Sequence, residues 1–250
     1  SDVDYAKQSL HEYDVQHGMD GMSKVRALLD VLPLLRRYAG RTIVIKYGGS
    51  ALDAASTDTI LEDAAALQSV GVRVILVHGG GKEISALLEK LNVESQFADG
   101  YRVTDEVTLQ AAEMALSARV NKSIVAALDR IGAKACGLSG RDGGLITARQ
   151  KDKALGLVGT ITKVDPQVLR TLLDGGYLPV VSPIAAGEDG GGFNCNADDA
   201  ARAVAAALGA DKLIFLTDTA GVLIDSHNSK TAVPHMDVKR AEELIDTGLI

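Results

Sequence analysis

Four short segments carry the residue types with which proteins bind phosphate and carboxylate groups. They are residues 46–50, 78–81, 194–198 and 217–222, and three of them follow directly on a run of β-branched and other apolar residues. In a parallel α/β sheet such runs end at one edge, where the turns that follow present backbone amides to a ligand. The four segments therefore predict a site for a phosphate-bearing ligand.

Lys46 ends an apolar run and stands two residues before the pair Gly48 and Gly49. A buried strand has no structural use for an ammonium group, whereas a lysine at its carboxyl end beside glycines is well placed to meet an anion. A side chain that only extends to solvent explains the same position, and both readings remain open.

A run of three glycines, residues 79–81, follows His78 and precedes a predicted helix. Consecutive amides at the positive end of a helix dipole bind carboxylates or phosphates, although a tight turn that needs positive φ angles explains the glycines too. The segment is neither a P-loop nor a dinucleotide fingerprint, because Glu83 follows Lys82 and the third spaced glycine is missing. We expect His78 to be packed or hydrogen-bonded rather than a general base.

Further polar residues are candidates for ligand contacts. Arg102 precedes a long predicted helix, where its guanidinium could grip a carboxylate with two hydrogen bonds, and a surface arginine is the equal alternative. Asn194, Asn196 and Asp198 alternate into a helix start, where they could orient a ligand or a lysine; helix capping accounts for one of them. Residues 217–222 suit a contact to nucleotide phosphate or ribose, or a turn rich in capping residues.

Composition narrows the class of ligand. The 250 residues include 26 Lys and Arg against 33 Asp and Glu, a net charge of -7, which argues against a nucleic-acid surface. Cys136 and Cys195 match no metal or redox spacing and are expected to be buried free thiols. No apolar run approaches the ~18 residues of a membrane span, and the N-terminus lacks signal-peptide features. A cytoplasmic protein is expected, or a plastid-stromal one if a transit peptide was removed.

The elements that must position these residues alternate between strand and helix, which predicts right-handed crossovers and a mostly parallel sheet. Three short β-type runs in the middle of the chain predict hairpins. The expected helices are 23–38, 57–69, 82–91, 105–129, 165–174, 196–208 and 238–247; the strands are 42–47, 72–77, 177–184 and 213–217, with hairpin runs at 133–138, 145–148 and 156–162 and a loop at 187–192.

Taken together, the four segments closely resemble the amino-acid kinase family, over about residues 23–250. The combination of residues 46–50, 99–104, 119–122, 176–182 and 194–198 is similar to the branch that phosphorylates N-acetyl-L-glutamate in arginine biosynthesis. The resemblance implies an α/β fold, an open αβα sandwich with a mostly parallel central sheet. It implies an N-terminal extension at 1–22, a lobe at 23–185 for the acyl amino acid and dimer contacts, and an incomplete ATP-binding lobe at 186–250.

The resemblance also implies roles for individual residues. ATP, bound with Mg²⁺, would give its γ-phosphoryl group to the side-chain carboxylate, with Lys46 stabilising that group and Asp198 positioning catalytic lysines. No protein metal ligand is predicted. The substrate would contact Gly80, Gly81, Arg102 and Asn194, and the nucleotide would contact Gly48, Gly49, Thr217, Asp218, Thr219, Ala220, Gly221, Val222 and Leu223. Because the carboxylate nucleophile is already ionised, no general base is required.

Partners follow from the same resemblance. The helix at 23–38 is similar to one that joins dimers into hexamers in arginine-inhibited members, although packing on its own domain explains its apolar face equally. Arginine is an expected feedback inhibitor, and a PII-type protein is a candidate partner. Family members continue beyond residue 250 to a second catalytic lysine, so a catalytically weak binding module is one alternative function, and a kinase for another acidic amino acid is the other.

Overall fold

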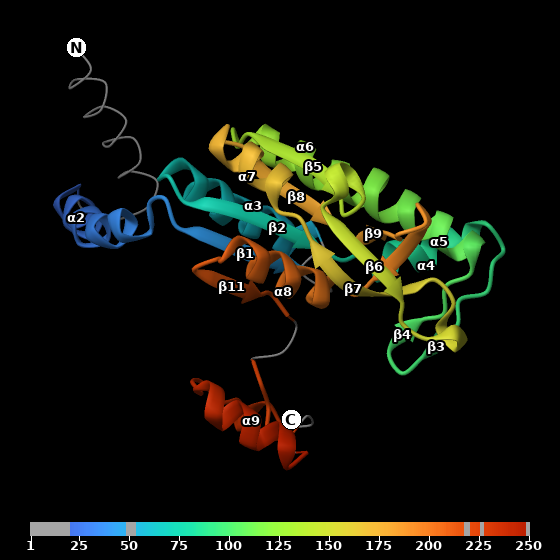
Figure 1. Cartoon of the computed structure of the whole chain (residues 1–250). Coiled ribbons are helices and arrows are strands. Elements are labelled where there is room, and N and C mark those ends of the chain that lie inside the picture. Colours follow the sequence, from blue (N-terminus) through green and yellow to red (C-terminus); the bar gives the residue numbers. More distant parts are fainter. Residues whose placement is uncertain (1–20, 49–53, 218–220, 226–227, 249–250) are drawn as a thin grey trace.

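A five-stranded parallel sheet forms the centre of the computed structural model (Figure 1), which describes residues 21–48, 54–217, 221–225 and 228–248. All four strand pairings are parallel, so every strand ends at the same edge. In spatial order the strands are β11 (Lys212–Phe215), β1 (Thr42–Tyr47), β2 (Arg73–His78), β8 (Leu178–Ser182) and β5 (Ala135–Ser139). The register pairs Lys46 with Val77 and Tyr47 with His78 across β1 and β2.

Helices cover both faces of this sheet, which confirms the predicted αβα sandwich. Alternate residues of β1 and β2 enter opposite cores, as the period of two requires. On one face Ile45 and Leu76 join a cluster with α3 (Ala54–Ser69) and α6 (Asn121–Arg130). On the other face Val44 and Ile75 join a cluster with α7 (Gln167–Asp174) and α8 (Ala197–Leu208).

A small closed barrel of four strands stands beside the main sheet. It comprises β6 (Ile146–Gln150), β7 (Val158–Val164), β9 (Ile184–Ala186) and β10 (Gly192–Cys195), with the short 3-10 helices Asp142–Gly144 and Lys153–Leu155 before and after β6. The antiparallel pair of β6 and β7 confirms the hairpin expected there. The strand expected over 177–184 is divided into β8 and β9 at Pro183, and β10 was not predicted.

One expected hairpin strand was wrong. The run at 133–138 forms β5, which pairs in parallel with β8 at the edge of the main sheet. Short apolar runs occur both in hairpins and in buried parallel strands, so the sequence pattern alone did not distinguish these two arrangements.

The long helix expected over 105–129 has a π-helical middle. It runs as α5 (Glu106–Glu113), a π-helix (Met114–Val120) and α6. Together with α4 (Gly81–Lys90) it buries a third apolar cluster. Between α4 and α5 lies a two-stranded hairpin that was not predicted, β3 (Phe97–Ala98) and β4 (Tyr101–Arg102), whose turn residues Asp99 and Gly100 both have positive φ, as hairpin turns of two residues require.

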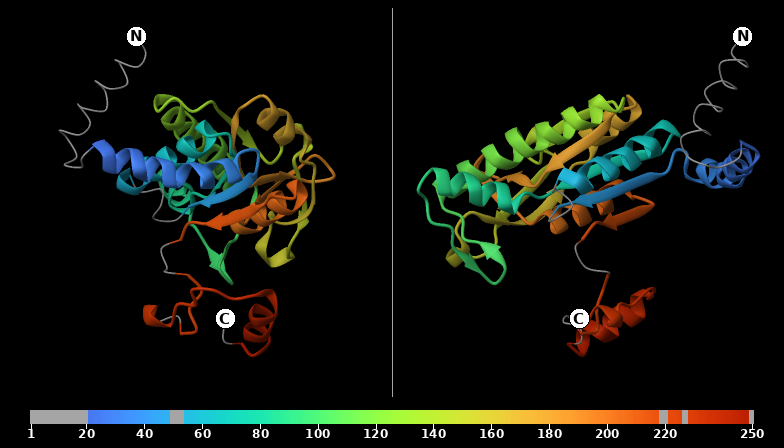
Figure 2. Two further views of the ribbon diagram at one scale, coloured as in Figure 1. Left: turned by 90° about the vertical axis from the view of Figure 1, so that its left-hand side faces the viewer. Right: turned by 180° about the vertical axis from the view of Figure 1, so that it is seen from behind.

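Figure 2 shows α2 (Gly21–Tyr38) at the end of the molecule opposite the β3–β4 hairpin. Val25, Leu29, Val31 and Leu32 on this helix are exposed, with 58% of Leu29 accessible, so packing on their own domain leaves much of these four side chains in contact with water. At the other terminus the 3-10 helix Ser229–Thr231 and α9 (Val238–Asp246) lie apart from the sheet in Figure 1. Of the helices described, none is long and apolar enough to cross a bilayer.

Replacement of a leucine in the central sheet will test the assigned core. Leu76 is fully buried in β2, so Leu76→Ala is expected to lower the free energy of unfolding by about 2–5 kcal/mol through lost burial and a residual cavity. The matched variant Leu91→Ala removes the same atoms from a residue that is 47% exposed and should change stability far less. Urea unfolding of both variants gives the comparison, and equal losses would contradict the core assignment.

Candidate functional site

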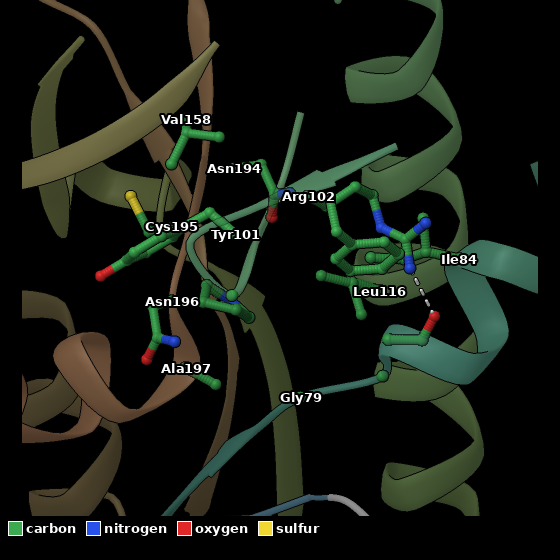
Figure 3. Close-up of a pocket in the computed structure, with 15 residues that line it drawn as sticks. Gly79, Ile84, Tyr101, Arg102, Leu116, Val158, Asn194, Cys195, Asn196 and Ala197 are labelled. Carbon is green, nitrogen blue, oxygen red and sulfur yellow. Dashed lines mark hydrogen bonds between the residues drawn. The ribbon is translucent and has the colours of Figure 1, made fainter. Parts of the chain in front are cut away.

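A pocket of about 210 Å³ opens at the carboxyl edge of the sheet (Figure 3). Three segments far apart in the sequence supply most of its lining: the β2–α4 turn with the start of α4, the β3–β4 hairpin, and the end of β10 with the start of α8. All four residues predicted to bind substrate line it. Its walls are Gly79, Gly80, Gly81, Ile84, Phe97, Gly100, Tyr101, Arg102, Leu116, Val158, Pro183, Asn194, Cys195, Asn196 and Ala197.

The glycine turn at the start of α4 is held in a conformation that only glycine tolerates. Gly80 has φ of 151°, and a Cβ there would lie 2.6 Å from Leu116 Cδ2. Gly80 is the N-cap of α4 and supplies no capping side chain, so the first amides of the helix have no side-chain acceptor at their cap. The tight-turn interpretation of the glycines is confirmed, and anion binding by the amides that this turn brings to the pocket stays a prediction.

Arg102 is a buried wall of the pocket, so the surface-arginine alternative is wrong. Only 7% of the residue is exposed. Its guanidinium donates a hydrogen bond to the Gly81 carbonyl at 2.9 Å (Figure 3). It also donates to the Ser95 hydroxyl and to Ser85 Oγ at 2.8 Å, and it stacks 4.6 Å from the Phe97 ring. Burial lowers the Arg102 pKa, but a guanidinium starts so high that it keeps its charge. A fixed positive group therefore faces the pocket.

The three alternating polar residues that run from β10 into α8 have three different roles. Asn194 lines the pocket, and its amide donates to Thr104 Oγ1 at 3.4 Å. Asn196 is the N-cap of α8, where its Oδ1 accepts from the backbone N–H groups of Asp198 and Asp199. Asp198 reaches across to the sheet and forms an ion pair with Lys46. Capping thus explains only the middle residue.

Lys46 does not simply extend to solvent. Its side chain is 15% exposed, and its Nζ lies 3.0 Å from Asp198 Oδ1. A Cβ on the neighbouring Gly48 would sit 3.4 Å from this Nζ and 3.5 Å from the backbone nitrogen of Gly79. Glycine at position 48 thus leaves open the space between the ammonium group and the β2–α4 turn, which is where an anion would approach the lysine.

Two buried titratable groups near the turn, His78 and Cys195, are uncharged at neutral pH. Burial lowers the pKa of His78 to about 4, and the charge of Lys122 acts in the same direction against the hydrogen bond to Gly79. Burial also raises the pKa of the Cys195 thiol to about 12, with a smaller contribution from Asp199. His78 is packed and hydrogen-bonded as expected. Cys195 is a buried free thiol, while Cys136 is free but only half-buried.

The structure describes only some of the residues that were predicted to contact the nucleotide. Gly49, Asp218, Thr219 and Ala220 lie outside the described residues. Thr217 follows β11 at the same edge as Lys46, whose carbonyl accepts from Leu216 N at 3.1 Å. The remaining three, Gly221, Val222 and Leu223, belong to the segment set apart from the sheet, where Leu223 pairs with Ala232. None of these three lines the pocket, and the nucleotide contacts stay a prediction.

Sequence reasoning missed three residues that shape the pocket. Ser85 and Ser95 hold the Arg102 guanidinium, and Leu116 packs against Gly80 from the π-helix. Ser85 stands one helical turn after Gly81, a spacing that could have marked it. No sequence signal marked Ser95 or the π-helical turn. In the part of the chain that the structure describes, no three His, Cys, Asp or Glu side chains gather as metal ligands.

A parallel sheet with a lysine and glycine turns at its carboxyl edge is the arrangement of a phosphoryl-transfer enzyme, and comparison with known proteins defines the class. The chain belongs to the amino acid kinase family, whose model matches residues 41–250. It is 48% identical over 230 residues to the acetylglutamate kinase of Nostoc punctiforme, and the aligned region covers 91% of this chain and 77% of that relative. The acetylglutamate kinase of Synechocystis sp. is 46% identical over 235 residues, and the aligned region covers 93% of this chain and 79% of that relative.

A solved structure shows the same fold. N-acetylglutamate synthase from Neisseria gonorrhoeae, complexed with coenzyme A and N-acetyl-glutamate, superposes with a TM-score of 0.74 at 26% identity. The match covers 89% of this chain and 51% of that one. The family resemblance seen in the sequence is thereby confirmed.

A pair of alanine substitutions will test the strained turn. Gly80→Ala forces a side chain into Leu116 at a φ that alanine avoids, and is expected to cost at least about 2 kcal/mol of unfolding free energy. The matched Gly81→Ala meets no atom within 4 Å of the added Cβ and should be nearly neutral for stability. Thermal unfolding measures both. A neutral Gly80→Ala would show that the turn is not constrained as described.

Proposed function

We propose that this chain transfers the γ-phosphoryl group of ATP to the side-chain carboxylate of N-acetyl-L-glutamate, giving N-acetyl-L-glutamate 5-phosphate for arginine biosynthesis. The observation that carries the proposal is the Lys46–Asp198 ion pair of 3.0 Å beside a pocket lined by glycine amides and Arg102. The relatives named acetylglutamate kinase support this choice of substrate within the family.

The pocket suits a small molecule with two carboxylates. Arg102 offers charge to one carboxylate, and the amides at the start of α4 offer hydrogen bonds to the other. The Asn194 amide, on the wall formed by β10, can hydrogen-bond the acyl amide group. The chain as a whole is negative, with a net charge of -7, so it does not attract an anionic substrate from a distance. Binding therefore depends on where these individual groups are placed.

The chemical step needs alignment and charge neutralisation more than proton transfer. A glutamate side chain has an ordinary pKa of about 4.3, so the nucleophile is ionised at neutral pH and His78 is not needed as a base. The Lys46 ammonium would meet the negative charge on the phosphoryl group as it moves, and Asp198 keeps that ammonium at the end of β1. Losing such a group commonly costs on the order of 10²-fold in rate.

Mg²⁺ would be held mainly by nucleotide phosphates and water, which is its usual coordination in phosphoryl-transfer sites and requires no carboxylate cage. When bound, it neutralises phosphate charge. Gly48 keeps the approach to Lys46 open for a phosphate, since a side chain there would press on Lys46 Cε at 3.3 Å. ATP contacts at residues 217–223 are part of the proposal.

We propose a homodimer or hexamer in the cytoplasm or plastid stroma as the working form. The exposed apolar residues of α2 support an intersubunit contact, because such a surface is costly in water. Inhibition by arginine and binding of a PII-type protein remain predictions from the family resemblance.

Acyl-phosphate formation tests the proposed activity directly. With N-acetyl-L-glutamate, ATP and Mg²⁺, trapping by hydroxylamine should give a hydroxamate, and Lys46→Ala should lower kcat by about 10²-fold because a positive group facing the transition state is lost. Lys90→Ala, on the exposed far end of α4, is the matched control and should retain full turnover. Preference for free glutamate or aspartate would indicate another kinase of the family, and binding without turnover would favour a binding module.

Arg102→Lys tests the substrate-binding side of the pocket. A lysine keeps the charge but loses the planar fork and the bonds to Ser85 and Gly81, so KM for N-acetyl-L-glutamate should rise about tenfold or more while KM for ATP stays the same. Steady-state kinetics with each substrate varied in turn separates the two constants. Equal increases in both would argue that the variant disturbs the fold instead.

A further inference from the structure

A buried hydrogen-bond chain behind the pocket begins at Asn121, the first residue of α6. Lys122 Nζ lies 3.0 Å from Asn121 Oδ1, and an ammonium group can only donate. On the other side the Asn121 Nδ2 lies 2.9 Å from the Val180 carbonyl and 3.2 Å from the Leu138 carbonyl, which can only accept. These three partners fix the orientation of the amide, with its NH₂ group turned into the sheet.

The fixed amide sets the tautomer of His78. Asn121 Nδ2 also lies 3.1 Å from His78 Nε2, so this ring nitrogen faces a donor and must be the acceptor. The ring is fully buried and uncharged, and its proton therefore sits on Nδ1. His78 Nδ1 lies 2.8 Å from the carbonyl of Gly79, which needs a donor there. The Asn121 NH₂ group has two hydrogens for three acceptors, so at least one hydrogen is shared, and the donor and acceptor roles along the hydrogen-bond chain are otherwise consistent.

The hydrogen-bond chain ends at the Gly79–Gly80 peptide. The Gly79 N–H donates to the Tyr47 carbonyl at 2.9 Å, and the Gly79 carbonyl is turned back to the His78 ring. In a trans peptide the carbonyl and the following N–H point in opposite directions. With the Gly79 carbonyl held inward by His78, the Gly80 N–H is directed away from the core and toward the pocket that Gly79 and Gly80 line.

We propose that His78 is a positioning residue, which holds the Gly79 carbonyl inward so that the Gly80 amide is presented to the carboxylate of the acyl amino acid. The identity of that ligand rests on the proposed function; the orientation of the peptide does not. His78 is fully buried and is not among the residues that line the pocket, so it would act through its one backbone hydrogen bond to Gly79.

The turn needs such a restraint because glycine flanks the peptide on both sides. Glycine populates positive and negative φ about equally, so a peptide between two glycines rotates easily unless a bond holds it. An inverted peptide would point a carbonyl oxygen at an anionic ligand. The neutral ring suits this task, because protonation of Nε2 would place one donor against another at Asn121. With a pKa near 4, His78 stays neutral throughout the physiological range.

Two amide substitutions at position 78 separate this role from simple packing. In His78→Asn the side-chain nitrogen is bonded to Cγ, as Nδ1 is in histidine, and can still donate to the Gly79 carbonyl. In His78→Gln the amide lies one bond further out, near the place of Nε2, and that donor is lost. In both variants the two N–H bonds of Asn121 keep the Val180 and Leu138 carbonyls as acceptors.

The affinity of these two variants for N-acetyl-L-glutamate, measured by calorimetry, tests the proposal. His78→Asn should bind within a few-fold of the unaltered chain, and His78→Gln should bind about tenfold or more weakly than His78→Asn, the effect of one lost hydrogen bond to a charged group. KM for ATP should be the same in both. Equal affinities in the two variants, at equal thermal stability, would overturn the proposal.

The tautomer provides a readout that does not depend on activity. Nitrogen-15 NMR of the unaltered chain at pH 7 should show His78 neutral with its proton on Nδ1, and crystal structures should show the Gly79–Gly80 peptide inverted or mixed in His78→Gln only. A proton on Nε2 would overturn the inference whatever the substrate is. The expected tautomer and peptide in a chain that does not phosphorylate N-acetyl-L-glutamate would contradict the proposed function alone.

Discussion

The parallel register of β1 against β2 is the constraint on which the site depends. It pairs Lys46 with Val77 and Tyr47 with His78, so the lysine and the glycine turn leave the sheet side by side. Because successive side chains of a strand point to opposite faces of the sheet, Lys46 and His78 lie on different faces. Lys46 lies on the same face as Val44, beneath α8, where Asp198 meets it. His78 lies on the face of Leu76, beneath α6, where Asn121 meets it. A slip of one residue would exchange these faces and break both contacts.

The two positive groups that face the pocket, Lys46 and Arg102, have partners that limit their movement. Asp198 holds Lys46, while Gly81, Ser85, Ser95 and the Phe97 ring hold Arg102. The partners of Arg102 are mostly uncharged, so its positive charge is left for a ligand. Fixed dipoles and charges of this kind need little reorganisation during reaction, which is the main electrostatic contribution of a protein to phosphoryl transfer.

The sheet, its flanking helices and most of the pocket were predictable because they follow from local patterns. Apolar runs ending in glycine predicted β1 and β2, and the residues at and after the carboxyl ends of these runs marked Lys46, Gly80 and Gly81 as site candidates. The sequence could not place β5, because partners distant in the chain decide whether an apolar run joins a hairpin or a parallel sheet. The burial of Arg102 was equally hidden, since it depends on the β3–β4 hairpin and on Ser95, which no sequence signal marked. The division into two lobes at residue 186 stays a prediction.

The central claim is that the glycine amides and Arg102 bind the acyl amino acid with its reacting carboxylate toward Lys46. A crystal structure of the chain with N-acetyl-L-glutamate and a non-hydrolysable ATP analogue tests it most directly. The account predicts one carboxylate on the Gly80 and Gly81 amides, open toward the Lys46 ammonium, and the other on Arg102. Ligand bound elsewhere, with the Gly80 turn empty, would contradict it.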